Sequence, residues 1–327
     1  MLSVVRAFIS GGAGFIGSHL ISRLVGRTDV ESVVVFDNLT SGRREYLTPF
    51  QSDDRVRLVE ADLKDVDAVT RAMQGSDTVF HLAANPDIAK AVTQPDIDFW
   101  EGTYLAQNVL EAVRLTGVKH IFYTSGSGVY GEAPDTPFAE SFGPCKPIST
   151  YGASKLACEA LISSYCSMFG IIGRAFRFAN VVGPRQTHGV GYDFVRRLRA
   201  DPTQLRILGD GTQTKSYIYI DDVLDAIFLV GERVSADVPY DIFNVATDDY
   251  ISVNQIADIA VAECALGAGS VRYAHTGGDR GWKGDVPKVL FDLRKIKALG
   301  WQSKRTSAEA MRDALRAMIG ELEQQTA

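Results

Sequence analysis

The segment SGGAGFIG, at residues 10–17, constrains the fold more than any other part of the sequence. It follows the apolar run 4–9 and precedes a longer amphipathic stretch, so a strand, a tight turn and a helix are expected in succession. Gly11, Gly14 and Gly17 allow the backbone to turn tightly and approach a pyrophosphate, whose charge the helix N-terminus stabilises. This context predicts a dinucleotide-binding unit rather than an ordinary glycine-rich turn.

The first half of the chain alternates short β-branched runs with longer amphipathic segments, which indicates βαβ units and a parallel sheet. Residues 100–115 and 151–169 have helical periodicity, and the runs 120–124 and 175–179 are expected to be strands. The predicted class is therefore α/β: a Rossmann doubly wound parallel sheet with a smaller C-terminal α/β substrate domain.

The composition of the sequence changes past Asn180, where glycine and turn residues become frequent. This change indicates a second domain. The strand-like run 241–247 is expected to return to the main sheet, so the domain boundary is crossed more than once. We assign residues 1–180 with 212–250 to a dinucleotide-binding domain, and residues 181–211 with 251–327 to a nucleotide-sugar-binding domain.

Composition narrows the class of protein. The 327 residues are 46% hydrophobic and 23% charged, and no apolar stretch is long enough to span a bilayer, which predicts a soluble protein without a membrane partner. The apolar N-terminus breaks at Arg6, so we interpret it as a buried strand rather than a signal peptide. A net charge of -6 argues against nucleic acid as the main partner. Four cysteines without paired spacing predict reduced thiols, a cytoplasmic location and no metal site.

The second predicted strand ends in VVVFDN, which places Asp37 twenty residues after Gly17. A carboxylate there accepts both ribose hydroxyls of adenosine and repels a 2'-phosphate, so the sequence favours NAD over NADP. Arg43 and Arg44 could bind such a phosphate and weigh against this preference. Asp62, at the end of the third strand, suits either the adenine edge or a plain surface loop.

The motif YGASK places Tyr151 and Lys155 four residues apart, so both side chains share one helix face. A free phenol has a pKa of about 10 and is a poor base at neutral pH. A nearby ammonium and a positive nicotinamide ring favour the phenolate. Downstream of a dinucleotide loop, the pair predicts that Tyr151 takes a proton from a substrate hydroxyl while the adjacent carbon is oxidised.

Together these segments resemble the extended short-chain dehydrogenase/reductases. The resemblance is carried by SGGAGFIG, FDN, HLAA at 81–84, YGASK and RFANVVGPRQ, and it spans nearly the whole chain. Within that family, KSYIYIDD and GGDRGWKGDVP are most similar to the UDP-galactose 4-epimerase group. The resemblance implies NAD as cofactor, a UDP-sugar as substrate and a homodimer built from the helices near 100–115 and 151–169.

The resemblance also implies residue roles. Tyr151 would be the catalytic base and acid, and Lys155 would bind the nicotinamide ribose and tune Tyr151. The remaining cofactor contacts implied are Gly11, Gly14, Phe15, Ile16 and Gly17 at the pyrophosphate, Asp37, Asn38, Ser41 and Gly42 at the adenosine ribose, Asp62 and Leu63 at the adenine, and Leu82, Ala83 and Ala84 along the middle of the cofactor.

On the substrate side, Asn180 would meet the UDP phosphates, and Lys215 stands where the family usually has an arginine. Arg280, Asp285 and Gln213 would hold the phosphate and ribose region. The full substrate set implied is Pro86, Ser127, Asn180, Arg185, Val190, Gln213, Lys215, Arg280 and Asp285.

One position departs from the family pattern. The strand end before VYG normally presents a Ser or Thr hydroxyl to the sugar C4 oxygen, 25 residues before the tyrosine, and here that position is Gly126. Ser125 and Ser127 flank it, but successive strand side chains face opposite ways, so neither replaces the hydroxyl while the strand stays regular. Ser127, Ser125 or a water could fill the gap on an altered backbone path, or Tyr151 works without this partner.

The resemblance implies a UDP-sugar 4-epimerase acting through a 4-keto intermediate. A nucleotide-sugar 4,6-dehydratase needs an Asp-Glu pair after the strand end, where this chain has Ser127 and Gly128. Arg185 suits a sugar carboxylate, a phosphate or a structural contact equally, which leaves UDP-glucose or UDP-galactose and UDP-glucuronate or UDP-galacturonate open. A non-catalytic dinucleotide-binding protein is a further hypothesis, for which Gly126 is the main support.

Overall fold

The computed structural model describes residues 5–132, 135, 137–267 and 269–324. The described chain forms two compact units. The first takes its residues from 1–129, 150–177 and 224–243, and the second from 130–149, 178–223 and 244–327. Among the described residues, no helix has the length and apolar character required to cross a membrane.

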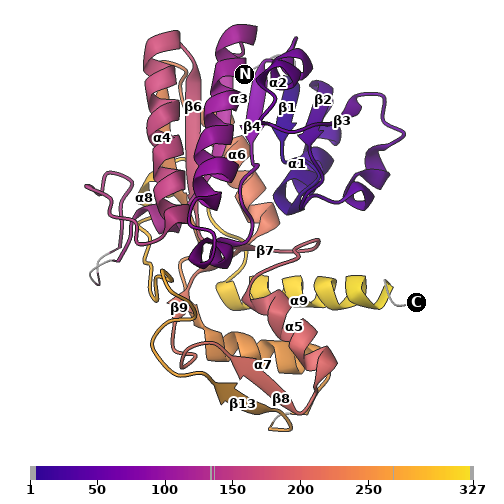
Figure 1. Ribbon diagram of the computed structural model, residues 1–327, viewed down its shortest axis with the longest axis vertical. Coiled ribbons are helices and arrows are strands. Elements are labelled where there is room, and N and C mark those ends of the chain that lie inside the picture. The colour runs from indigo at the N-terminus through magenta and orange to yellow at the C-terminus, as the bar shows by residue number, and fades with distance from the viewer. Residues whose placement is uncertain (1–4, 133–134, 136, 268, 325–327) are drawn as a thin grey trace. The chain divides into compact units, whose positions relative to one another are not determined.

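The first unit is built on a seven-stranded sheet (Figure 1). The strand order is β11-β6-β5-β4-β1-β2-β3, and the pairs β1–β2, β2–β3, β1–β4 and β4–β5 are parallel. Because the order reverses between β1 and β4, a ligand crevice is expected at the carboxyl ends of these two strands. The strands are β1 Val5–Ser10, β2 Val30–Asp37, β3 Val56–Glu60, β4 Thr78–His81, β5 His120–Gly126, β6 Ile172–Phe178 and β11 Tyr240–Val245.

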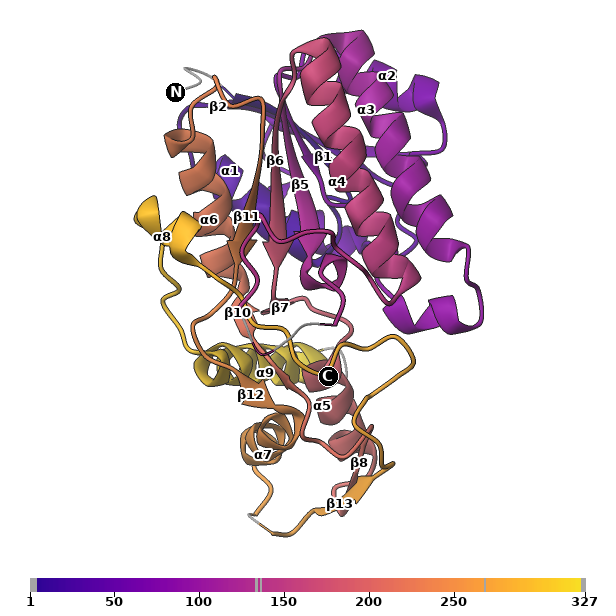
Figure 2. The same ribbon diagram turned by 90° about the vertical axis from the view of Figure 1, so that its left-hand side faces the viewer.

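Helices cover both faces of this sheet, and Figure 2 shows α2, α3 and α4 on one face with α1 and α6 on the other. The apolar stripes of the helices pack on strands whose side chains are buried on both faces, as in other parallel sheets. The predicted doubly wound α/β class is therefore confirmed. The helices are α1 Phe15–Val25, α2 Val66–Met73, α3 Tyr104–Thr116, α4 Thr150–Phe169 and α6 Ile220–Arg233, with shorter turns at Arg44–Phe50, Ile88–Val92, Phe99–Thr103 and Ser127–Val129.

The second unit combines helices with three two-stranded sheets. Phe194, Leu205, Ile256 and Leu315 are buried in its separate apolar core. The strand pairs are β7 Asn180–Val182 with β10 Tyr217–Tyr219, β9 Thr214–Lys215 with β12 Ile251–Ser252, and β8 Gln204–Ile207 with β13 Arg272–His275. The helices are α5 Val190–Ala200, α7 Val253–Glu263, α8 Arg294–Ala298 and α9 Ser307–Gln324.

The division between the units differs from the expected domain boundaries. Strand β11 joins the main sheet as expected, but residues 212–223 and 244–250 belong to the second unit. The physical reason is strand pairing, because β9 pairs with β12 and β10 with β7 instead of extending the main sheet. Residues 130–149 also join the second unit, so the chain crosses between units earlier than the sequence indicated.

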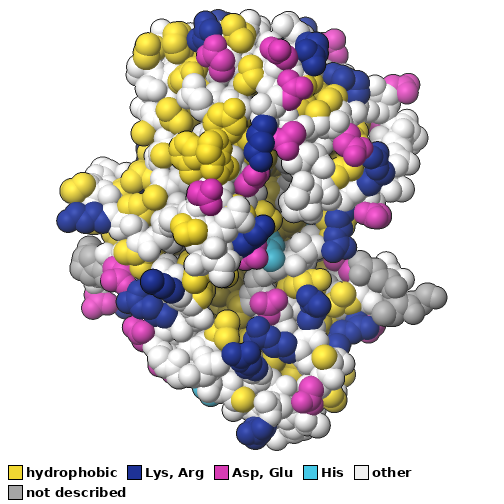
Figure 3. Space-filling view, in the orientation of Figure 1, with side chains coloured by type: hydrophobic (Ala, Val, Ile, Leu, Met, Phe, Trp, Pro, Cys, Tyr) yellow, Lys and Arg dark blue, Asp and Glu magenta, His cyan; other side chains and the backbone are white. Residues whose placement is uncertain are grey.

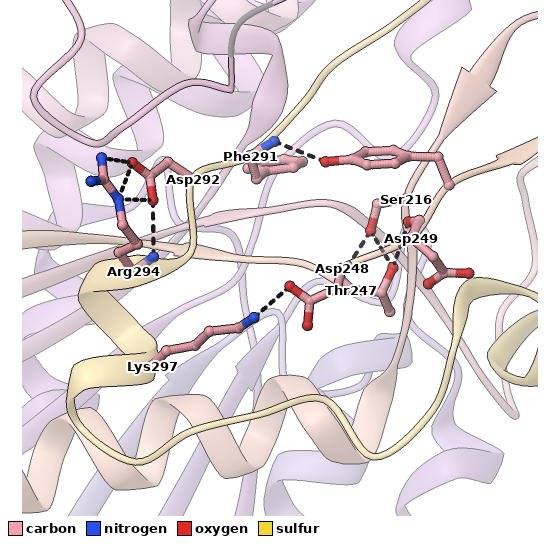
Figure 4. Close-up of polar contacts among 9 residues, drawn as sticks. Ser216, Thr247, Asp248, Asp249, Phe291, Asp292, Arg294 and Lys297 are labelled. Atoms are coloured by element: carbon pink, nitrogen blue, oxygen red, sulfur yellow. Dashed lines mark hydrogen bonds and ion pairs between the residues drawn. The ribbon is translucent and has the colours of Figure 1, made fainter.

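A chain of buried hydroxyls connects segments of the second unit, and Figure 4 shows the part of it between Ser216 and Thr247. Thr247 Oγ1 lies 2.7 Å from Ser216 Oγ and 2.6 Å from Ser307 Oγ, and Ser307 Oγ accepts the Tyr217 N–H at 3.0 Å. The Asp249 carboxylate accepts the Ser307 N–H at 2.9 Å, at the first residue of α9. These bonds satisfy polar groups that the core would otherwise leave without partners, and they fix the start of α9 against β10.

Candidate active site

The glycine loop begins at the carboxyl end of β1 and leads directly into α1. Gly11 has φ +74°, and a Cβ there would lie 2.8 Å from the Ala83 backbone nitrogen. A Cβ on Gly17 would lie 2.5 Å from the Gly11 carbonyl oxygen, so both positions require glycine. Gly14 provides no side-chain cap to α1, which leaves the first N–H groups of the helix available to an anion.

Asp37 ends β2 beside this loop and is buried. Its carboxylate accepts the Ala13 N–H at 2.9 Å and the Leu39 N–H at 2.8 Å. Burial raises the Asp37 pKa, and these two backbone hydrogen bonds oppose that rise by stabilising the charged form. A Cβ on Gly42 would lie 2.7 Å from Asp37 Oδ1, so the loop segment 38–42 passes close over the carboxylate.

Neighbouring residues bear on the choice between NAD and NADP. The Arg44 guanidinium forms an ion pair with Glu60, and the Arg43 guanidinium lies 5.9 Å from the centre of the Tyr46 ring. Asp37, at the end of β2, would repel a 2'-phosphate, and Arg44 is already paired with Glu60. Both features favour NAD over NADP.

The expected adenosine and mid-cofactor residues also lie at strand ends in the first unit. Asn38 Nδ2 donates to Asp62 Oδ2 at 3.2 Å, which brings these two expected residues together. Strand β4 ends at His81, so residues 82–84 continue from its carboxyl end, and the Leu82 N–H donates to the Ser10 carbonyl at 3.1 Å. The glycine loop and the residues after β4 therefore lie side by side, at the switch point of the strand order.

Tyr151 and Lys155 lie in the first turns of α4, next to the end of β5. Lys155 is 5% exposed, its Nζ donates to the Thr124 carbonyl at 2.7 Å, and it lies 5.5 Å from the centre of the Tyr151 ring. Thr150 anchors the start of the helix by donating to Asp98 Oδ2 at 2.7 Å. The first unit thus places an ammonium beside the phenol that sequence reasoning assigned to acid-base chemistry.

The strand end around Gly126 has a specific geometry. Ser125 Oγ donates to Glu159 Oε1 at 2.5 Å, and this carboxylate pairs with Arg177 at 2.7 Å in a buried ion pair. Strand β5 ends at Gly126 and a short helical turn starts at Ser127, so side-chain alternation no longer governs where Ser127 points. A Cβ on Gly126 would meet no heavy atom within 4 Å, which means that a side chain has room there.

Sequence reasoning did not single out Glu159. The signal was available, because Tyr151, Lys155 and Glu159 recur every four residues and therefore lie along one stripe of α4.

Four expected substrate residues come together in the second unit. Lys215 forms an ion pair with Asp285, and Arg280 Nη1 donates to the Asp285 carbonyl at 3.2 Å and pairs with Glu132. Gln213 is 4% exposed and donates to the Leu208 carbonyl, while its Oε1 has no hydrogen-bond partner among the described residues. A buried amide oxygen without a partner is costly, so this cluster is suited to bind a donor group of a ligand.

The remaining expected residues are distributed over both units. Pro86 follows β4 in the first unit, whereas Asn180 starts β7 and Val190 starts α5 in the second. The Arg185 backbone has φ +65°, and its N–H donates to Glu321 Oε1 at 2.9 Å. The described residues contain no group of three His, Cys, Asp or Glu side chains arranged to hold a metal ion.

Comparison with known proteins identifies the family. The sequence pattern of the NAD dependent epimerase/dehydratase family matches residues 7–246. A UDP-glucose 4-epimerase from Mycolicibacterium smegmatis is 33% identical over 94% of this chain and 96% of its own length. A crystal structure of a UDP-galactose 4-epimerase aligns with TM-score 0.85 at 38% identity, covering 97% of this chain and 99% of that one. The Thermus thermophilus UDP-glucose 4-epimerase in complex with NAD aligns with TM-score 0.83 at 31% identity, covering 96% and 99%.

The chain therefore belongs to the NAD dependent epimerase/dehydratase family and is an enzyme of that family with NAD as its cofactor. The residues present fit this cofactor. The glycine loop leaves no space for side chains, the uncapped start of α1 suits a pyrophosphate, and the Asp37 carboxylate suits ribose hydroxyls.

The close packing of the glycine loop predicts a large effect of one added methyl group. We expect Gly17→Ala to weaken NAD binding by roughly tenfold or more, equivalent to about 1.4 kcal/mol, because the new Cβ overlaps Gly11 and Gly12. Gly26→Ala, at the other end of α1, is the matched control, since a Cβ there makes only ordinary contacts at 3.5 Å. Calorimetric titration with NAD measures both variants, and equal affinities in the two would contradict the expectation.

Proposed function

We propose that the protein is a UDP-sugar 4-epimerase that inverts the C4 hydroxyl through a 4-keto sugar. The observation that carries the proposal is the buried Lys155 ammonium beside the Tyr151 ring, at the carboxyl end of β5 in the unit that carries the glycine loop. Its support from relatives is the 33% identity to a UDP-glucose 4-epimerase over nearly the full length of both chains.

In this proposal Tyr151 takes the proton from the C4 hydroxyl and later returns it. The Lys155 ammonium stabilises the phenolate form of Tyr151, which is otherwise scarce at neutral pH. Bound NAD supplies the acceptor and donor for the hydrogen at C4. The UDP group is held firmly while the loosely held keto sugar turns its other face to the cofactor. The residues proposed to hold UDP are Asn180, Gln213, Lys215, Arg280 and Asp285.

The rival 4,6-dehydratase reaction requires an additional acid and base to remove water. The places directly after the strand end hold Ser127 and Gly128, neither of which can carry out that proton transfer at neutral pH. Epimerisation needs only the Tyr151 proton transfer, so it is the reaction that the residues at this strand end support.

We propose Ser127 as the hydroxyl that replaces the family serine or threonine at position 126. Ser127 stands in the helical turn that follows β5, so strand alternation does not fix the direction of its side chain. We expect Ser127→Ala to lower kcat by roughly tenfold, a loss typical of one hydrogen bond in the transition state. Gly126→Ser, which has room for its side chain, should restore part of the loss in the Ser127→Ala background. Undiminished turnover of Ser127→Ala removes Ser127 from the mechanism.

The sugar is either a neutral hexose or a hexuronate, and Arg185 is the residue we propose to distinguish them. A guanidinium binds a C6 carboxylate through two parallel hydrogen bonds but gains little from a C6 hydroxyl. Proton NMR of the products from UDP-glucose, UDP-galactose, UDP-glucuronate and UDP-galacturonate tests both the reaction and the substrate. If Arg185→Ala lowers kcat/KM selectively for the acidic sugars, the substrate is a hexuronate. Absence of any C4 epimer would contradict the proposed reaction.

A homodimer through α3 and α4 is part of the proposal. Large apolar side chains on these helices and on the turn before α3 face solvent, and Figure 3 shows hydrophobic atoms gathered over this face of the first unit. A second copy is the occupant that would cover them, because the same surface on two copies is self-complementary. Sedimentation of the parent and of Met168→Glu measures whether two copies associate through this surface. The exposed residues are Phe99 at 51%, Trp100 at 46%, Leu115 at 52%, Met168 at 71% and Phe169 at 41%.

The four cysteines are free thiols, which supports a reducing, cytoplasmic location. We include that location in the proposal, and fractionation of cells that produce the protein tests it.

A further inference from the structure

Three buried side chains form a row across the neighbouring strands β1, β4 and β5. Ser10 of β1 stands opposite His81 of β4, and His81 stands opposite Tyr123 of β5. Ser10 Oγ lies 2.7 Å from His81 Nδ1, and the His81 and Tyr123 rings are stacked with centroids 5.6 Å apart. The three residues are at most 2% exposed. The row therefore runs from the residue before the glycine loop to the third strand along.

The row ends against Lys155. The Lys155 ammonium lies 5.0 Å from the centre of the Tyr123 ring and 5.5 Å from that of Tyr151. Its one hydrogen-bond acceptor among the described residues is the Thr124 carbonyl. A buried ammonium with few acceptors is unfavourable unless other groups stabilise its charge, and the face of an aromatic ring does so. Tyr123 thus holds the ammonium from one side while Tyr151 lies on another.

The groups around Lys155 preserve its charge. Burial lowers the pKa of His81 to about 3, so its imidazole is neutral at working pH and does not repel the ammonium. Burial raises the pKa of the Tyr123 phenol well above its usual value, so that ring also stays uncharged. From α4 itself, Cys158 contacts the Tyr123 hydroxyl and its thiol pKa is raised by burial, while Glu159 is paired with Arg177.

We propose that Tyr123 is a positioning residue, whose ring face fixes the Lys155 ammonium beside Tyr151, and that Ser10 and His81 brace this ring from the strand that carries the glycine loop. The inference rests on the proposed function for the role of Tyr151. It goes beyond that function because it assigns a role to Tyr123, which lies inside the apolar run of β5 and takes no part in the proton transfer. In this arrangement the side chains of Ser10, His81 and Tyr123 connect the glycine loop with Lys155.

Removing the ring tests the proposal. In Tyr123→Leu we expect kcat to fall by roughly tenfold to thirtyfold with KM little changed, the size expected for a desolvated cation–ring contact. Tyr123→Phe keeps the ring face and should recover most of the activity. Phe122→Leu is the matched control, because it removes the neighbouring β5 ring, which stacks on Phe80 and Phe176 and not on Lys155. Activities are normalised to the folded fraction, and Tyr123→Met replaces Tyr123→Leu if the latter does not fold.

A second readout does not depend on turnover. The position of Lys155 Nζ relative to the Tyr151 ring is compared in crystal structures of the parent, Tyr123→Leu and Phe122→Leu. We expect Lys155 Nζ to leave its place beside the Tyr151 ring in Tyr123→Leu and to keep it in Phe122→Leu.

The outcomes separate the two proposals. If the parent epimerises UDP-sugars and Tyr123→Leu behaves like Phe122→Leu in both kcat and the position of Lys155, the positioning role is wrong and the proposed function stands. If the parent inverts no UDP-sugar, the proposed function is wrong, and the position of Lys155 in the variants alone decides whether Tyr123 holds it. A shift of Lys155 confined to Tyr123→Leu, together with recovery in Tyr123→Phe, supports the inference.

Discussion

Replacing Tyr151 by phenylalanine is expected to lower kcat by roughly a thousandfold or more. Proton transfer by a positioned side chain contributes about 10²–10⁴-fold to an enzymatic rate. In the proposed mechanism Tyr151 makes both proton transfers, so the phenyl ring can make neither. Because the ring remains in place over the Lys155 ammonium, NAD content and thermal stability should stay close to those of the parent.

The matched control is Tyr165→Phe on the same helix. The Tyr165 hydroxyl accepts a hydrogen bond from Gln107 Nε2 at 2.7 Å, and we assign it no role in the reaction. Its loss should leave kcat within about twofold of the parent and lower stability by no more than about 1.5 kcal/mol. Initial rates of UDP-sugar interconversion measure both variants. Turnover of Tyr151→Phe at a tenth of the parent rate or faster contradicts the assignment.

Replacing Glu159 by glutamine is expected to destabilise the fold by about 3–5 kcal/mol. Glu159 and Arg177 are each 3% exposed, and the carboxylate accepts both the 2.7 Å bond from Arg177 and the 2.5 Å bond from Ser125. The amide loses the ionic attraction, so the Arg177 charge remains buried without its carboxylate. Denaturant unfolding of the parent and the variant measures the loss.

Two further variants show whether burial causes this loss. Glu60→Gln breaks an exposed pair with Arg44, whose side chains are 53% and 56% exposed, and should cost less than about 1 kcal/mol. The double variant Glu159→Met with Arg177→Met removes both buried charges and should recover most of the stability. A double variant as unstable as Glu159→Gln shows that packing around the pair, rather than an uncompensated charge, dominates.

Much of the first unit could be predicted from its sequence because local patterns and tertiary contacts agree there. The glycine loop lies between a buried strand and a helix, and the approach of Gly11 to Ala83 gives the physical reason for glycine. The four-residue spacing of Tyr151 and Lys155 placed them on one face of α4, where the ammonium lies next to the ring. These features depend on short-range periodicity, which the sequence displays directly.

Other features depend on pairings that a pattern does not reveal. Strands β9 and β10 are two and three residues long, and their partners β12 and β7 are distant in the sequence. The sequence pattern does not reveal these pairings, so the predicted domain boundary differs from the boundary between the two units. The turn at Ser127 follows a strand whose composition does not mark where it stops. Tyr123 lies in an apolar run, and the sequence pattern does not distinguish it from the other core residues. Its stacking on His81 is therefore visible only in the structure.

The central claim is that one tyrosine and one lysine support oxidation and re-reduction of the same sugar carbon. The most direct measurement is conversion of a UDP-hexose or UDP-hexuronate labelled with deuterium at C4, in ordinary water, with NMR of the product. The account predicts a C4-inverted product that keeps the deuterium at C4, formed by the parent and not by Tyr151→Phe. Inversion with loss of the label to water, or equal inversion by both proteins, would contradict it.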